Sequence, residues 1–143
     1  MRSHLDNDGP IHQLIERLGD VQRLVRLHAA ARLSALGKTE PAVVNALVEA
    51  LREGSAGARK MAALALGDIG ASASTAIPAL AQAMSDEDEG VARRSALALA
   101  ALGNEASAAR AALQRALSHS SERGRAMAAF ALQELGHGRS WAA

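Results

Sequence analysis

The chain has 143 residues and a formal net charge of +1; 49% of its residues are hydrophobic, 1% are aromatic and none is cysteine. This composition excludes disulfide scaffolds, cysteine nucleophiles and cysteine-based zinc sites, and the small net charge gives no general attraction to nucleic acid. The opening "MRSHLDNDGP" has no apolar secretory segment, and no apolar run approaches the length of a membrane span. We therefore expect a soluble, cytoplasmic protein.

Apolar residues recur every three or four positions along the chain, which is the pattern of amphipathic helices. After a tail at residues 1–10, "IHQLIERLGD" predicts a single helix that forms a half repeat at 11–20. Three repeats of two helices follow, which we name the A helix and the B helix of each repeat, at 21–53, 54–86 and 87–119. A final A helix is expected within 120–136 and a second tail at 137–143, so that 11–136 forms one domain.

The repeats are visible as columns of like residues spaced by 33 positions. One column is leucine (Leu33, Leu66, Leu99, Leu132), and a second is glycine (Gly37, Gly70, Gly103, Gly136). We expect each glycine to end its A helix with a positive φ, which glycine adopts at no steric cost. The period predicts an all-α fold, an α-solenoid of about eight antiparallel helices in which each pair buries its apolar face against its neighbours.

Turn residues mark the expected helix starts. The B helices of the first two full repeats are predicted to begin with a threonine cap and a proline in the first turn, where a missing N–H costs nothing. These pairs are Thr39 with Pro41 and Thr75 with Pro78. For the A helices we predict N-caps at Ser55 and at either Ser85 or Asp86.

The A helices carry a shared motif, written "VRLHAAARLSALG" (25–37), "ARKMAALALGDIG" (58–70), "VARRSALALAALG" (91–103) and "GRAMAAFALQELG" (124–136), and one B helix begins "IPAL" at 77–80. These stretches resemble the short bacterial HEAT-like repeat, including the variety found in phycobilisome lyases. The resemblance implies the fold and leaves function open, because the shared residues are packing residues. In the third repeat Ala92 stands in the arginine column, with Arg93 and Arg94 beside it.

Residues suited to catalysis or metal binding are few. His12 and Glu16 lie four residues apart and could supply two metal ligands, which is too few for a site. The run "SDEDEG" (85–90) lacks the distal glutamate of a calcium loop, because Leu97 stands at that position. The sequence thus predicts no catalytic residue, no metal site and no cofactor, and a protein that is not an enzyme.

The solvated side of the B helices is expected to line the concave surface of the solenoid. Its charge passes from acidic to basic along the chain, and its small residues suit an extended or helical protein segment. The candidate partner-binding residues are His12, Glu16, Asn45, Glu49, Gln82 and Arg115. We therefore predict a protein-interaction module or scaffold; the alternative is that these residues only keep the surface soluble.

Basic residues collect at the starts of the A helices: Arg26, Arg59, Lys60, Arg93, Arg94 and Arg125. Cations there oppose the helix dipole, so a compensating interaction is expected. One interpretation pairs them with acids in the preceding turns, such as Asp20, Glu53 and Asp86. The other is an anion-binding edge for acidic protein, lipid headgroups or nucleic acid, of which nucleic acid is the less favoured partner.

The last A helix has no B partner, so Met127 and Phe130 are expected to present apolar surface. Trp141 is predicted to fold back as a cap or to lie in a frayed tail, and the alternative is an interface for self-association or for a partner; the protein is thus expected to be a monomer or to self-associate weakly through the C-terminal end. The resemblance to phycobilisome lyases implies one further alternative, a non-catalytic accessory subunit of a chromophore-lyase-type protein.

Overall fold

The computed structural model describes residues 9–104 and 106–142, except for the side chains of residues 119 and 136–142. This part of the chain holds eight α-helices and one 3-10 helix, with no strand: α2 (Pro10–Arg17), α3 (Arg23–Gly37), α4 (Pro41–Glu53), α5 (Ala56–Ile69), η1 (Gly70–Ala76), α6 (Ile77–Ala83), α7 (Glu89–Gly103), α8 (Ser107–His119) and α9 (Glu122–Ala142). The predicted all-α class is confirmed.

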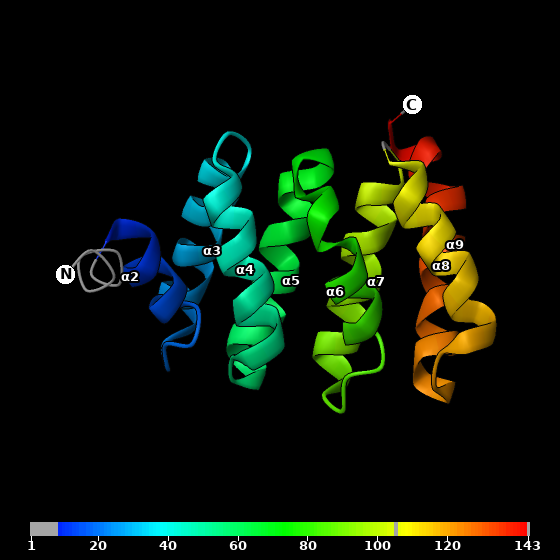
Figure 1. Ribbon diagram of the computed structural model, residues 1–143, viewed down its shortest axis with the longest axis horizontal. Coiled ribbons are helices and arrows are strands. Elements are labelled where there is room, and N and C mark those ends of the chain that lie inside the picture. The colour runs from blue at the N-terminus through cyan, green and yellow to red at the C-terminus, as the bar shows by residue number, and fades with distance from the viewer. Residues whose placement is uncertain (1–8, 105, 143) are drawn as a thin grey trace.

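The helices form two layers that run along the longest axis of the molecule (Figure 1). The A helices α3, α5, α7 and α9 pack one against the next, and the B helices α2, α4, α6 and α8 do the same. The layers are joined because each B helix also contacts the A helix that follows it in the chain. This arrangement confirms the predicted α-solenoid, with α2 at one end of the stack and α9 at the other.

The core lies between the two layers and is built from the repeated leucine and alanine columns. Leu33, Leu66 and Leu99 are fully buried, and burying each leucine stabilises the fold by about 1.5–3 kcal/mol. Small residues let neighbouring A helices approach closely: a Cβ placed on Gly67 of α5 would lie 3.1 Å from the Cα of Ala98 on α7. The core is thus built from closely packed helices with small side chains, which agrees with the scarcity of aromatic residues.

The glycine column departs from the expected role. Gly70 alone among the described residues has a positive φ, of 77°. Gly37 and Gly103 are instead the last residues of α3 and α7, whose C-caps Lys38 and Asn104 are right-handed. The prediction of a positive φ at the glycine of each A-helix end is therefore correct for Gly70 and wrong for Gly37 and Gly103.

Close packing explains the other two glycines. A Cβ on Gly37 would overlap the Cδ1 of Ile69, the residue that ends the next A helix, and would lie 2.8 Å from its Cγ1. A Cβ on Gly103 would likewise lie 3.1 Å from the Cδ1 of Leu135 on α9. At these two repeat ends the missing side chain leaves room for the aliphatic residue of the next repeat to pack over the glycine.

The predicted helix caps are confirmed in part. Ser55 caps α5 by accepting a hydrogen bond from the Ala58 N–H at 3.2 Å. Asp88, and neither Ser85 nor Asp86, caps α7, because its Oδ1 accepts from the Val91 N–H at 3.0 Å. The threonine caps are wrong: the N-caps of α4 and α6 are Glu40 and Ala76, neither with a side-chain cap bond. Both B helices do have the expected proline in their first turn.

The last A helix is longer than its sequence unit. We expected it to end near Gly136 and to leave a tail at 137–143, but α9 continues to Ala142. Its residues Met127, Phe130 and Leu135 are partly buried and pack against the core. The predictions for the Trp141 side chain fall outside the described side chains.

One described segment, Ala56–Ala83, is long and apolar enough to cross a membrane when judged by length and composition. The expectation that no stretch reaches that length was therefore wrong. The segment is not one straight helix, because the positive φ of Gly70 separates α5 from η1 and α6. The 14 residues of α5 rise by about 21 Å, short of the ~30 Å of a bilayer core. Half of the apolar window is buried inside the protein, as in a core helix.

Candidate functional site

Arginine side chains at one repeated position of the A helices donate hydrogen bonds to the turns that precede those helices. Nη1 of Arg26 donates to the carbonyl of Val21 at 3.1 Å, and that of Arg59 donates to the carbonyl of Gly54 at 2.9 Å. Arg125 makes the equivalent bond to the carbonyl of Ser120 at 2.9 Å. Each bond reaches five residues back, to the turn between a B helix and the next A helix. These cations therefore neutralise carbonyl dipoles of the turn, which compensates for their place at a helix N-terminus.

The third repeat has Ala92 in this column, and an arginine from the next repeat takes over. Nη1 of Arg123 donates to the carbonyls of Asp86 and Glu87 at 2.8 and 2.7 Å. Those carbonyls correspond, two repeats earlier, to the carbonyls of Asp20 and Val21, both of which are bound by Arg26. In the first repeat this pair of turn carbonyls is bound by an arginine of the same repeat. In the third repeat the equivalent pair is bound by an arginine of the following repeat.

Arg59 also joins two repeats through an ion pair. Its Nε and Nη2 donate to the two carboxylate oxygens of Asp86, each at 3.0 Å, and the two side chains are only 17% and 16% exposed. The predicted pairing with acids is therefore confirmed at this residue, but the acid lies in the following turn. Arg26 differs again, because it binds the Asp20 carbonyl and not its carboxylate.

Asp88 sits beside this pair. Its backbone N–H donates to Oδ1 of Asp86 at 2.8 Å, while its own carboxylate caps α7. The hydrogen bond from the Val91 N–H lowers the pKa of Asp88, and the positive charge of Lys60 lowers it further. Lys60 itself packs beside Gly90, at the start of the next A helix.

The remaining basic residues of the predicted edge also face the protein. The guanidinium of Arg93 lies over the ring of Phe130, with its carbon 5.0 Å from the ring centroid. Arg94 lines a small hollow of about 130 Å³ between α5 and α7, together with Asp68. Four of the six predicted edge residues thus bind groups of the solenoid itself: Arg26, Arg59, Arg93 and Arg125.

In the described part of the B-helix face, a hollow lies between each pair of successive B helices. The hollow between α2 and α4 measures about 290 Å³, the one between α4 and α6 about 420 Å³, and the one between α6 and α8 about 350 Å³. We name them the first, second and third hollow. Apolar side chains line all three, such as Ile15, Leu51 and Ile77 in turn.

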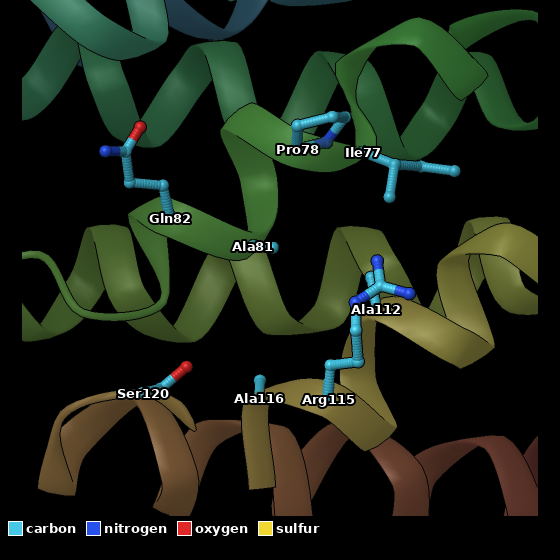
Figure 2. Close-up of a pocket in the computed structure, with 8 residues that line it drawn as sticks. All are labelled: Ile77, Pro78, Ala81, Gln82, Ala112, Arg115, Ala116 and Ser120. Atoms are coloured by element: carbon cyan, nitrogen blue, oxygen red, sulfur yellow. The ribbon is translucent and has the colours of Figure 1, made fainter. Parts of the chain in front are cut away.

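Neighbouring hollows share a residue. Glu53 lines both the first and the second hollow, and Gln82 lines both the second and the third. In the third hollow, Arg115 projects from α8 into the space between the two helices, opposite Ile77 and Pro78 of α6 (Figure 2). The hollows therefore form a continuous row along the B-helix face, crossing the repeats one by one.

Most of the predicted partner-binding residues lie in this row. His12 and Glu49 line the first hollow, Gln82 the second and third, and Arg115 the third. Glu16 lies beside the row, with its Oε1 3.1 Å from Nε2 of His12. Asn45 is exposed on α4 but lines none of these hollows.

This face is also lined by three residues that were not predicted from the sequence to lie there, Arg52, Glu53 and Asp86. Glu53 lies four residues after Glu49, so the helical period itself was a signal that the two share a face. Asp86 gave no such signal, because it follows the end of α6 and reaches the second hollow through the turn. In the part of the chain that the structure describes, no three His, Cys, Asp or Glu side chains could together hold a metal ion.

The repeats of this solenoid match a known protein family. The model of HEAT repeats matches residues 11–100 and again 47–133. The chain belongs to the HEAT-repeat family. A comparison with curated proteins found no match. HEAT repeats are helical pairs that commonly act as scaffolds for other proteins, so the family agrees with the solenoid described above.

Solved structures place this HEAT-repeat chain among related solenoids. It is similar to human deoxyhypusine hydroxylase, with a TM-score of 0.64 and 31% identity over 89% of this chain and 43% of that one. It thus spans less than half of the hydroxylase chain, which by its name is an enzyme. The phycocyanin lyase complex of CpcE and CpcF from Nostoc sp. PCC7120 gives a TM-score of 0.56 and 20% identity over 91% of this chain and 85% of that one.

A designed armadillo repeat protein, solved in complex with the peptide (KR)4, is also similar. The TM-score is 0.53 and the identity 20%, over 93% of this chain and 67% of the designed one. The likenesses to the lyase and to the designed protein establish the fold of the HEAT-repeat chain and nothing more specific.

Proposed function

We propose that the chain is a non-catalytic scaffold that binds an extended segment of another protein along the B-helix face. The observation that carries this proposal is the row of three hollows, in which Glu53 and Gln82 each border two neighbours. A continuous row favours a ligand that crosses several repeats over a compact ligand held in one pocket.

The dimensions of the row suit an extended polypeptide. Packed helices lie about 8–10 Å apart, and an extended chain of the polyproline II kind, with three residues per turn and a rise of about 3.1 Å per residue, presents every third side chain on the same side about 9 Å apart. A bound segment could therefore place one side chain in each hollow. The similar designed armadillo protein carries a peptide, which supports the same use of a solenoid here.

The A-helix edge is the weaker candidate surface. Arg26, Arg59 and Arg125 already donate to turn carbonyls, and Arg59 is also paired with Asp86. An anion bound at this edge would have to compete with these hydrogen bonds. On the B-helix face, Glu49, Glu53 and Gln82 line the hollows without a side-chain hydrogen bond or ion pair in the described structure, so this is the surface that we propose for the partner.

Selection of peptides from a random display library against the wild-type protein tests the proposal. Enriched peptides are labelled, and their binding is measured by fluorescence anisotropy against Gln82→Trp, which places a bulky neutral side chain between the second and third hollows. The control is Gln133→Trp, the same substitution at an exposed residue of α9. We expect Gln82→Trp to weaken binding by roughly tenfold or more, because it removes well-packed contacts, and Gln133→Trp to leave it unchanged. Equal binding to both variants would contradict the proposal.

A further inference from the structure

The first hollow has an apolar floor and a rim of acidic residues. Ile11 and Ile15 come from α2, and Ala46 and Ala50 come from α4. Glu49 and Glu53 stand at its rim, one helical turn apart on α4. No lysine or arginine lines this hollow, whereas Arg52 lines the second and Arg115 the third.

The two carboxylates are unfavourable for the stability of α4 itself. Like charges four residues apart repel each other, and Glu53 is the last residue of the helix, where negative charge opposes the dipole. Within the described part of the chain, neither side chain has an ion pair or a hydrogen bond. A cation brought to this rim would relieve both effects.

The other charged groups near the hollow do not supply that cation. His12 lines it, but its imidazole lies 3.1 Å from Glu16, an acid of its own helix. Arg52 projects from α4 into the neighbouring hollow. The unbalanced charge on this rim is therefore that of Glu49 and Glu53.

We propose that the first hollow binds an arginine or lysine side chain of the partner segment. The aliphatic stem packs on Ile11, Ile15 and the two alanines, and the cationic head binds Glu49 and Glu53. Long basic side chains suit such a site because they bury their methylene groups while the charge stays at the surface. This inference rests on the proposed function. It adds that the partner residue bound at the α2 end of the row is positively charged.

The probe is a fluorescein-labelled octapeptide of alternating alanine and arginine, compared with the same peptide in which citrulline replaces each arginine. Citrulline keeps the length and the hydrogen-bonding shape of arginine but carries no charge. Binding is measured by anisotropy to the wild type, to Glu49→Gln/Glu53→Gln, and to Glu40→Gln/Asp68→Asn. The last variant removes the same amount of charge from exposed residues outside the first hollow. Thermal melts of all three proteins check that folding is retained.

We expect the wild type to bind the arginine peptide about tenfold more tightly than the citrulline peptide, since charge-assisted hydrogen bonds are the strong ones. Glu49→Gln/Glu53→Gln should abolish this preference, and Glu40→Gln/Asp68→Asn should keep it. A preference that is absent in the wild type, or that survives in Glu49→Gln/Glu53→Gln, would overturn the inference. The scaffold proposal has its own readout in Gln82→Trp, so one proposal can fail while the other stands.

Discussion

At the scale of single residues, one buried hydroxyl interrupts an alanine column. Ala29, Ala62 and Ala128 are fully buried at equivalent positions of their A helices, and Ser95 occupies the same place in α7. Within the described part of the chain, the Ser95 Oγ is buried without a hydrogen-bond partner. Ser34 is different, because its hydroxyl donates to the Ala30 carbonyl at 2.8 Å. The Ser95 hydroxyl therefore carries a desolvation cost with no compensating bond.

Ser95→Ala is expected to raise the free energy of unfolding by about 1 kcal/mol, because it removes the unsatisfied hydroxyl and leaves the alanine of the other repeats. Chemical denaturation measures the change. The matched control is Ser34→Ala, which loses a satisfied bond and should not be stabilising. A loss of stability in Ser95→Ala would mean that its hydroxyl has a partner in solution.

At the scale of elements, arginine side chains fix the turns between B and A helices. Arg26, Arg59 and Arg125 bind the carbonyl five residues back in their own turns. Arg123 does this for the turn of the third repeat, where Ala92 has no donor. The bond from Arg123 crosses from one repeat to the next, so it also strengthens the packing of α9 on the stack. The turn geometry is therefore maintained although the donor has moved to another repeat.

Arg123→Ala should lower the free energy of unfolding by about 1 kcal/mol, since it leaves the Asp86 and Glu87 carbonyls without their charged donor. Urea denaturation measures the change. Arg23→Ala, at an exposed arginine with no ion pair or hydrogen bond from its side chain in the described structure, is the control and should change stability little. Equal stability of Arg123→Ala and Arg23→Ala would refute this role of Arg123.

At the scale of the whole molecule, the two ends of the stack differ from its middle. Ala65 and Ala98 are buried against the preceding A helix, but Arg32, at the same position of α3, is exposed because no A helix precedes it. At the other end Ala129 is exposed, while its equivalents Ala63 and Ala96 are buried. The inner repeats thus have neighbours on both sides and the end helices on one, so stability should be highest in the middle.

Amide hydrogen exchange should follow this gradient. We expect the slowest exchange in α5 and α7, which have A-helix neighbours on both sides, and faster exchange in α2, which contacts only α3 and α4 among the larger packing contacts. Exchange followed by mass spectrometry, with peptides that cover each helix, measures the difference. Equal protection of α2 and α5 would show that the chain opens as a single cooperative unit and not repeat by repeat.

The sequence by itself determined the fold class, the 33-residue period and the order of the helices. It could do so because the leucine and alanine columns are periodic, and a helical period can be recognised from residues three and four apart. Ser55 and the first-turn prolines were predictable for the same reason, since their contacts lie within one turn. On the B-helix face, the period placed Glu49, Gln82 and Arg115 on one side of the helices that now line the row of hollows.

Only the tertiary structure decided the roles that depend on residues about 30 positions apart. Gly37 is needed because Ile69 of the next repeat packs over it, and not because the chain turns there with a positive φ. Arg123 replaces the donor missing at Ala92, and Asp86 reaches both Arg59 and the second hollow. A column in the sequence shows that a position is repeated. The contacts at that position depend on how far each repeat rotates and shifts against the next. That rotation and shift are set by the packing of the side chains.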